Sequence, residues 1–325
     1  MPAMQSITLK VDVDTYRGTR EGVPTLVRML RQAQADATFL FSLGPDHTGW
    51  ALRRALRPGF LQKVSRTSVV EHYGLKTLMY GVLLPAPDIG RECAGEMRST
   101  RDAGFECGIH AWDHVVWHDN VRRRDAAWTG EMMQQAYERF TSIFGVPPRT
   151  HGAAGWQMNP YALRQLDVFG FAYASDGRAC LNHDGTLCDP SAGPYRIASA
   201  GSTLSCIQLP TTLPTLDELL GRVIDGRVID TSNIVATILG LTATPREHVF
   251  TLHAELEGQK FAPMFKQLLM GWKRQGYEMV SMATHYARLG QRPLPSANVC
   301  WGALPGRSGE MLVQPYRQTP LLTEA

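Results

Sequence analysis

The chain has 325 residues, of which 44% are hydrophobic and 19% are charged, and its formal net charge at pH 7 is +3. This length and composition suit a globular protein with an ample core, and the small net charge argues against nucleic-acid binding. The six cysteines form no CxxC pair, so the sequence excludes a thiolate zinc site of that kind and favours a reducing cytoplasm.

The N-terminal stretch MPAMQSITLKVDVDT runs directly into a strand pattern and lacks the basic-then-apolar pattern of a signal peptide. No apolar run approaches the roughly 20 residues that a membrane-spanning helix needs. We therefore expect a cytoplasmic protein without a transmembrane helix.

Short β-branched or aromatic runs alternate along the chain with longer segments of helical periodicity. Strands are predicted over residues 7–13, 37–42, 105–109, 171–174, 204–209, 249–252 and 277–280. Helices are predicted over residues 22–34, 91–103, 125–143, 160–168, 215–220, 231–239 and 263–275. Because a strand followed by a helix predicts parallel strands with helical crossovers, about seven such units predict an α/β fold with a barrel-like sheet.

Two regions interrupt this rhythm. Residues 44–90 are long for a connection and mix basic with bulky apolar residues, so they are predicted to be an insertion. Residues 291–325 are rich in Pro, Gly and Gln and are predicted to form an irregular C-terminal tail. The main domain is therefore expected to span residues 1–290.

The first predicted strand ends in KVDVDT, which carries two carboxylates. Side chains alternate along a strand, so Asp12 and Asp14 point to one face and the intervening Val13 to the other. Two neighbouring carboxylates repel each other unless a cation or a shared proton relieves them. The alternative is that one of them caps the following turn.

Two histidines follow another predicted strand in the sequence GIHAWDH. A helical turn after the strand would aim His110 and His114 at one point, as a pair of metal ligands, although both are also compatible with surface or capping roles. Two further predicted strands end on Asp176 and His253. Because active sites of parallel α/β folds form at the carboxyl ends of the strands, these side chains are expected to share one rim.

A carboxylate and two imidazoles would hold a divalent cation and leave positions open for water and substrate. The remaining carboxylate and histidine would then be free to transfer protons, which indicates a metal-assisted hydrolase. The same ligands suit non-haem iron oxygenases, but those carry a close His-x-Asp pair on a β-rich fold, which fits this chain poorly.

Five sequence blocks, in this order, resemble the polysaccharide deacetylase family of metal-dependent N-deacylases. They are DVDTYRGTREGVP, GIHAWDH, AAGW, LPTTLPTLDE and HAELEG, and the resemblance runs from about residue 7 to residue 289. It implies a distorted (β/α)7 barrel. The blocks closely resemble a branch of the family that removes the formyl group of undecaprenyl-phosphate-linked 4-deoxy-4-formamido-L-arabinose, a step of lipid A modification and polymyxin resistance.

The resemblance also implies a role for each residue of the rim. Asp14, His110 and His114 correspond to the family's ligands for one divalent ion (Zn, Mn or Co), Asp12 to its catalytic base and His253 to its catalytic acid. The alternative within the family is an N-deacetylase of another amino sugar or of a cyclic amide. A different alternative is a non-catalytic protein that keeps the fold and a structural metal.

The chain departs from the family pattern in two places. Val13 separates aspartates that are usually adjacent, which the alternation along a strand tolerates. The family's Arg-x-Pro motif, whose arginine orients the base, is replaced here by THGAAGW, so Arg149 is only a candidate for that role.

Five further residues are candidates for contacts with the substrate. Arg17 and Arg20 follow the catalytic strand and would meet the substrate phosphate, unless they are surface arginines paired with a carboxylate such as Glu21. The other candidates are Trp156, for stacking on the sugar or packing at the rim, and Asp176 and Glu255, for binding sugar hydroxyls or orienting the ligating imidazoles.

The segment 53–84 alternates basic residues with bulky apolar ones such as Phe60, Leu61, Met79 and Tyr80. Such a segment can lie on an anionic membrane surface without crossing it. We expect it to contact the cytoplasmic face of the inner membrane and to guide the lipid-linked sugar, the alternative being a helical flap packed on the barrel.

Overall fold

The computed structural model describes residues 5–51, 75–199, 202–298, 300–307 and 309–314. The strands are β1 (Ser6–Val13), β2 (Thr38–Ser42), β3 (Glu106–Ala111), β4 (Thr150–His151), β5 (Tyr173–Ala174), β6 (Tyr195–Ser199), β7 (Ser202–Gln208), β8 (Val223–Ile224), β9 (Arg227–Val228), β10 (His248–His253), β11 (Glu278–Val280), β12 (Ser296–Asn298), β13 (Cys300–Ala303) and β14 (Glu310–Val313). The α-helices are α1 (Val23–Ala33), α4 (Leu75–Met79), α5 (Ile89–Glu92), α6 (Ala94–Asp102), α7 (His114–Asn120), α8 (Ala126–Phe144), α9 (Pro160–Val168), α10 (Leu216–Leu219), α11 (Ile234–Leu241), α12 (Ala262–Arg274) and α13 (Met282–Leu289). Shorter turns of 3-10 or π type are η1 (Gly18–Gly22), η3 (Val121–Arg123), η4 (Ala154–Trp156) and η5 (Leu256–Lys260).

The main sheet has ten strands in the order β10-β1-β2-β3-β4-β5-β7-β6-β12, with β11 pairing the start of β1. All its pairs are parallel except β6 with β7. The α/β class predicted from the sequence is therefore confirmed. Among the described residues no ladder joins β7 to β10; instead, the Thr212 N–H donates to the Val249 carbonyl (3.0 Å) and the Val249 N–H to the Thr212 hydroxyl (2.8 Å).

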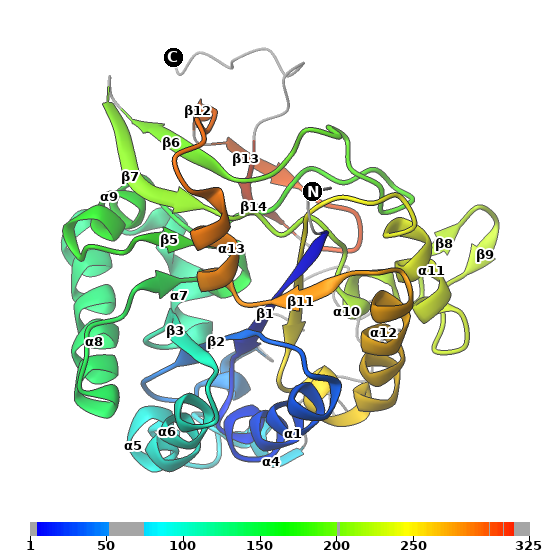
Figure 1. Cartoon of the computed structure of the whole chain (residues 1–325). Helices are drawn as coiled ribbons and strands as arrows, with labels where there is room; N and C mark the ends of the chain where they lie inside the picture. The colour runs from blue at the N-terminus through cyan, green and yellow to red at the C-terminus, as the bar shows by residue number, and fades with distance from the viewer. Residues whose placement is uncertain (1–4, 52–74, 200–201, 299, 308, 315–325) are drawn as a thin grey trace.

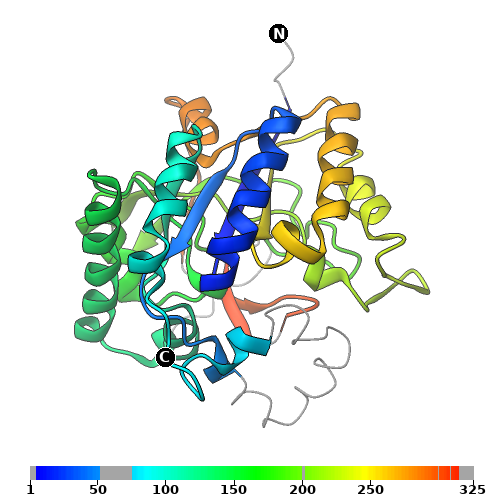
Figure 2. The ribbon, with the colours of Figure 1, turned by 90° about the horizontal axis from the view of Figure 1, so that it is seen from below.

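Helices surround the strands on the outside (Figures 1 and 2). Around this layer the successive neighbours are α9, α8, α6, α1, α12 and α11. Strand β1 pairs with β10, β2 and β11, and every residue of it is buried, as expected for a parallel strand covered on both faces. Leu9, Val11 and Val13 belong to the apolar core, whereas Lys10 and Asp12 take the alternate positions on the opposite face.

The predicted strands and helices agree with the observed ones, apart from shifts at their ends. Strand β4 is not predicted, because two residues carry no periodicity, and of helix α7 the sequence predicts only a turn that follows β3. The expectation of an irregular tail is wrong for its described part. Strand β12 pairs with β6, and β13 and β14 form a hairpin that bonds to Arg178.

Of the predicted insertion at 44–90, residues 52–74 lie outside the described residues. The part that follows forms α4, a tight turn and α5. In the part of the chain that the structure describes, no helix is long and apolar enough to cross a membrane.

Candidate active site

The predicted polar residues meet at the carboxyl ends of neighbouring strands. Asp12 and Asp14 stand at the end of β1, His110 is near the end of β3, and His253 ends β10. Asp12 and His253 are direct partners in the parallel register of β1 and β10. Two groups suited to proton transfer therefore lie on adjacent strands at one rim.

Asp14, His110 and His114 form the cluster whose ligand atoms all lie within 4.8 Å of one another. The His110 Nε2 is 3.1 Å from Asp14 Oδ1, and the His114 Nε2 is 3.5 Å from Asp14 Oδ2. His110 belongs to β3 and His114 is the first residue of α7, which begins there because the Asp113 carboxylate accepts the Val116 N–H. The two ring centroids are 5.4 Å apart, and both imidazoles lie beside the Asp14 carboxylate. The predicted helical turn does not lie between them, because β3 continues to Ala111 and α7 begins only at His114, so a non-helical bend brings the two rings together.

The tautomer of His110 makes this cluster suitable for a cation. Its Nδ1 is 2.6 Å from the carbonyl oxygen of Gly152, which can only accept, so Nδ1 carries a proton. When the ring is neutral, Nε2 therefore has a lone pair directed at Asp14 Oδ1, 3.1 Å away, and a cation between these two acceptor atoms removes their repulsion. Burial opposes ionisation of Asp14, but the imidazoles of His114 and His110 lower its pKa below the usual value, so the carboxylate stays charged.

Glu255 supports the carboxylate ligand rather than an imidazole. One of its oxygens accepts the backbone N–H of Asp14 (3.0 Å), the N–H of Thr15 (2.8 Å) and the Thr15 hydroxyl (2.8 Å). Gly18 permits this arrangement, because a Cβ there would lie 1.8 Å from the same oxygen. Gly18 begins η1 and Glu255 directly precedes η5, and both of these segments are π-type turns, a form of helix that is frequent at functional sites.

Asp176 holds the loop that orients His110. Its carboxylate accepts from His151 Nδ1 (2.6 Å), from the Ala153 N–H (2.9 Å) and from Gln208 Nε2 (3.0 Å). These bonds fix the backbone on both sides of Gly152, whose carbonyl accepts the hydrogen bond from His110 Nδ1. Because Asp176 is fully buried and used in these bonds, its position favours the orienting role over a contact with sugar hydroxyls.

Trp156 is buried, with 1% of its surface exposed. The cationic groups of Lys10, Arg178 and Arg307 lie 5.0, 4.5 and 4.8 Å from the centre of its ring. In this conformation the Trp156 ring packs inside the protein and has no open face for a sugar. Its position therefore favours packing at the rim over stacking on the sugar.

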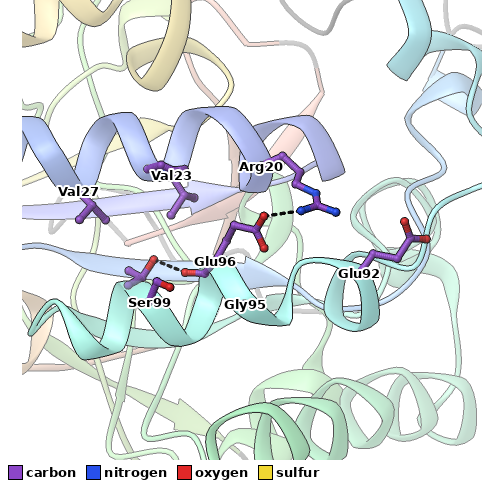
Figure 3. Close-up of a pocket in the computed structure, with 9 residues that line it drawn as sticks. Arg20, Val23, Val27, Glu92, Gly95, Glu96 and Ser99 are labelled. Carbon is purple, nitrogen blue, oxygen red and sulfur yellow. Dashed lines mark hydrogen bonds and ion pairs between the residues drawn. The ribbon is translucent and has the colours of Figure 1, made fainter.

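Both arginines proposed to meet a phosphate are already paired with carboxylates. Arg17 contacts Glu21 at 2.9 Å, the alternative foreseen from the sequence. Arg20 reaches Glu96 at 2.7 Å across a groove of about 650 Å³ between α1 and α6 (Figure 3). Because Glu92 and Glu96 both line that groove, it does not suit an anionic ligand.

Arg149 lies away from Asp12 and His253, whereas Lys10 lies beside Asp12. Arg149 is exposed and precedes β4, at the amino end of that strand and away from the rim, so its candidacy as the base-orienting arginine is wrong. Lys10, which the sequence analysis overlooked, contacts Asp12 at 3.0 Å. Its signal was available, because Lys10 shares a strand face with both aspartates in KVDVDT.

The backbone N–H of His253 donates to Glu257 Oε2 at 2.7 Å. Burial raises the pKa of Glu257 to about 7, and the neighbouring His253 partly offsets this. The His253 Nδ1 is buried and has no hydrogen-bond partner among the described residues. His253 is therefore held through its backbone, and one of its ring nitrogens makes no hydrogen bond within the described part of the chain.

The chain is similar to known proteins over most of its length. No family model matches the chain. It is 36% identical over 283 residues to a protein of Shewanella sediminis named as a probable 4-deoxy-4-formamido-L-arabinose-phosphoundecaprenol deformylase, covering 86% of each chain. A protein of Wigglesworthia glossinidia brevipalpis with the same name is 31% identical, over 78% of this chain and 82% of the relative.

Among solved structures, the chain is similar to one from Mycobacterium smegmatis assigned to the polysaccharide deacetylases. The TM-score is 0.60 with 14% sequence identity, over 94% of this chain and 97% of the other. At that identity the likeness concerns the fold alone, and it agrees with the distorted-barrel fold expected from the sequence.

Proposed function

Since the chain belongs to the family of 4-deoxy-4-formamido-L-arabinose-phosphoundecaprenol deformylases, we propose that it hydrolyses the formamide of the corresponding lipid-linked sugar to the free amine and formate. The observation that carries the proposal is the cluster of Asp14, His110 and His114 beside Asp12 and His253. The reaction would serve lipid A modification and resistance to polymyxin.

A divalent cation at the three ligands would polarise the formyl oxygen and make water a better nucleophile at neutral pH. Asp12 accepts the proton of the attacking water as the new C–O bond forms. His253 delivers a proton to the nitrogen as the C–N bond breaks, because an amine anion is too basic to leave. Glu255 and Asp176 keep the ligands in position throughout.

The test is product analysis with the purified, metal-loaded protein. A formamido sugar phospholipid is expected to release formate, and its acetamido counterpart little or no acetate. Release of acetate but not formate would favour the alternative, an N-deacetylase of another amino sugar. Elemental analysis of the same sample identifies the metal, for which Zn, Mn and Co remain open.

We further propose that the protein meets its lipid substrate at the cytoplasmic face of the inner membrane through the turn after α4. Val82 and Leu83 are 52% and 75% exposed there. The turn is held in place by Trp50, whose Nε1 donates to the Gly81 carbonyl at 2.7 Å. It lies near the site, because the adjoining Tyr80 packs edge-on against Tyr16, two residues after Asp14.

Tyr80 itself is 7% exposed, so it belongs to the scaffold of this turn and not to the apolar surface where the sequence interpretation put it. Phe60 and Leu61, also part of that interpretation, lie outside the described residues. The proposed contact therefore rests on Val82 and Leu83.

Co-sedimentation with anionic liposomes tests the membrane contact. Replacing Val82 and Leu83 by Ser is expected to lower the bound fraction several-fold, because apolar side chains at the acyl boundary provide the non-electrostatic part of such binding. The control is Val168→Ser at the end of α9, a site that is 75% exposed. Equal binding of both variants and the unmodified protein would exclude this turn as the anchor.

A further inference from the structure

Lys10 is a buried cation on the strand that carries the catalytic base. Its side chain is fully buried on the inner face of β1, and its Nζ lies 3.0 Å from Asp12 Oδ2. In the sheet register Lys10 stands opposite Thr38 of β2 and Thr251 of β10, two neutral residues. Because an unpaired buried ammonium is very costly, the ion pair with Asp12, together with the nearby charge of Asp176, stabilises Lys10 at this position.

The surroundings are shaped to hold this ammonium. A Cβ at position 152 would lie 2.8 Å from Lys10 Cε, so Gly152 leaves the space that the lysine stem occupies. The Trp156 ring lies under the ammonium, with its centre 5.0 Å from Nζ, at a distance where a ring face attracts a cation. Trp156 is in turn packed against Arg178, which is held by Glu218.

The contact with Lys10 gives the two oxygens of the Asp12 carboxylate different surroundings. Lys10 engages Oδ2, while Oδ1 is buried and accepts no hydrogen bond within the described part of the chain. This second oxygen lies 3.7 Å from Nδ1 of His110, a ligand of the candidate metal site. One oxygen is thus held by Lys10, and the other lies beside the ring of His110 without a hydrogen-bond partner among the described residues.

We propose that Lys10 is a positioning residue that holds the Asp12 carboxylate in the orientation needed to take the proton from the attacking water. The proposal rests on the function proposed above and assigns to a lysine of β1 the base-orienting role that the family's Arg-x-Pro arginine has elsewhere. Lys10 acts through Asp12 and touches neither water nor substrate.

A double-mutant cycle on the metal-loaded protein tests the proposal, with formate release as the assay. Lys10→Met is expected to lower kcat by about 100-fold, the order of a general-base contribution, with KM nearly unchanged. Lys10→Arg, which keeps a cationic donor, is expected to recover most of that loss. In an Asp12→Asn background, Lys10→Met is expected to cost nothing further, because the group that it positions no longer works.

Metal content separates positioning from damage to the fold. It is expected to stay at one ion per chain in Lys10→Met, and the matched control Lys266→Met, at an exposed lysine of α12, is expected to change neither metal nor kcat. If Lys10→Met does not fold, Lys10→Gln, which keeps an N–H for Oδ2, replaces it under the same criteria.

Near-normal kcat in the Lys10 variant, or a loss that adds fully to that of Asp12→Asn, would overturn the proposal. Loss of metal together with kcat would do the same, since Lys10 would then support the ligands. If instead Asp12→Asn alone retained turnover, the assignment of the base would fail, which is a failure of the proposed function and not of the role of Lys10 within it.

Discussion

At the scale of single residues, two aspartates two positions apart have different surroundings. Asp14 contacts both imidazoles, and its backbone N–H is held by Glu255. Asp12 contacts Lys10 and lies 3.7 Å from His110. The carboxylate beside two imidazoles suits a metal, and the carboxylate beside a cation with one unengaged oxygen suits a base.

Substitutions at these positions should separate metal binding from chemistry. Replacing His110 or His114 by Ala is expected to lower metal occupancy by at least about 10-fold together with activity, because one of three protein ligands is lost. Asp12→Asn is expected to keep the metal and lose turnover, since an amide cannot accept the proton. Elemental analysis beside the formate assay checks both. Full occupancy in the histidine variants would contradict the ligand assignment.

Arg17 remains a candidate for binding the phosphate of the substrate. Its pair with Glu21 is exposed, and such pairs contribute only about 0–1 kcal/mol, so a phosphate can displace Glu21 at little cost. Arg17→Ala is expected to raise KM several-fold for the lipid-linked substrate and to leave kcat within about two-fold. Steady-state kinetics checks this, and an equal rise of KM for a substrate without phosphate would argue against the contact.

At the scale of elements, the site depends on two π-type turns that meet backbone to backbone. A Cβ on Gly22 of η1 would lie 2.0 Å from the carbonyl oxygen of Ala254, and one on Gly258 of η5 would lie 2.7 Å from Gly22 Cα. This close approach brings Glu255 to the backbone of Asp14 and Thr15. The glycines of GTREG and HAELEG are therefore explained by the contact between the two turns.

Gly22→Ala is expected to destabilise the protein by about 2–3 kcal/mol, because a methyl group cannot fit against a backbone carbonyl without moving it. The shift of Ala254 and Glu255 should also weaken metal binding. Urea unfolding and metal titration measure the two effects. The control is Gly95→Ala in α6, where a Cβ meets nothing within 4 Å, and where about 0.5–1 kcal/mol of stabilisation is expected.

At the scale of the whole molecule, the sheet carries buried titratable groups far from the site. His248 begins β10, beside the Thr212 and Val249 contacts that close the gap between β7 and β10. Burial and then the neighbouring Arg246 lower the pKa of His248 to about 3. The folded protein therefore keeps this imidazole neutral, whereas the unfolded chain protonates it below about 6.5.

The stability of the protein should consequently fall as the pH drops from about 6.5 towards 3, because the unfolded state then binds the additional proton. His248→Asn removes this pH-dependent contribution to the free energy of unfolding. Between pH 7.5 and pH 5 the free energy of unfolding of the variant is expected to fall by about 2 kcal/mol less than that of the unmodified protein. Urea unfolding at the two pH values measures the difference, and parallel losses would mean that His248 is not responsible.

Much of the fold and of the metal ligands could be predicted because both depend on short-range patterns. Alternation along a strand puts Asp12 and Asp14 on one face, and a separation of only four residues keeps His110 and His114 close enough to reach one carboxylate. The rim of a parallel sheet then gathers residues from different strand ends. These rules need only neighbouring residues and the direction of each strand.

The amino-acid sequence by itself determined the alternation of strands and helices, the residues of the candidate metal site and the family to which the chain belongs. Only the tertiary structure decided what surrounds them: that Trp156 is buried among cations, that Asp176 orients the loop behind His110, and that Glu255 holds the Asp14 turn. Glu255 and Asp14 are 241 positions apart. Contacts at such separation arise from how the whole sheet closes, so no local pattern encodes them.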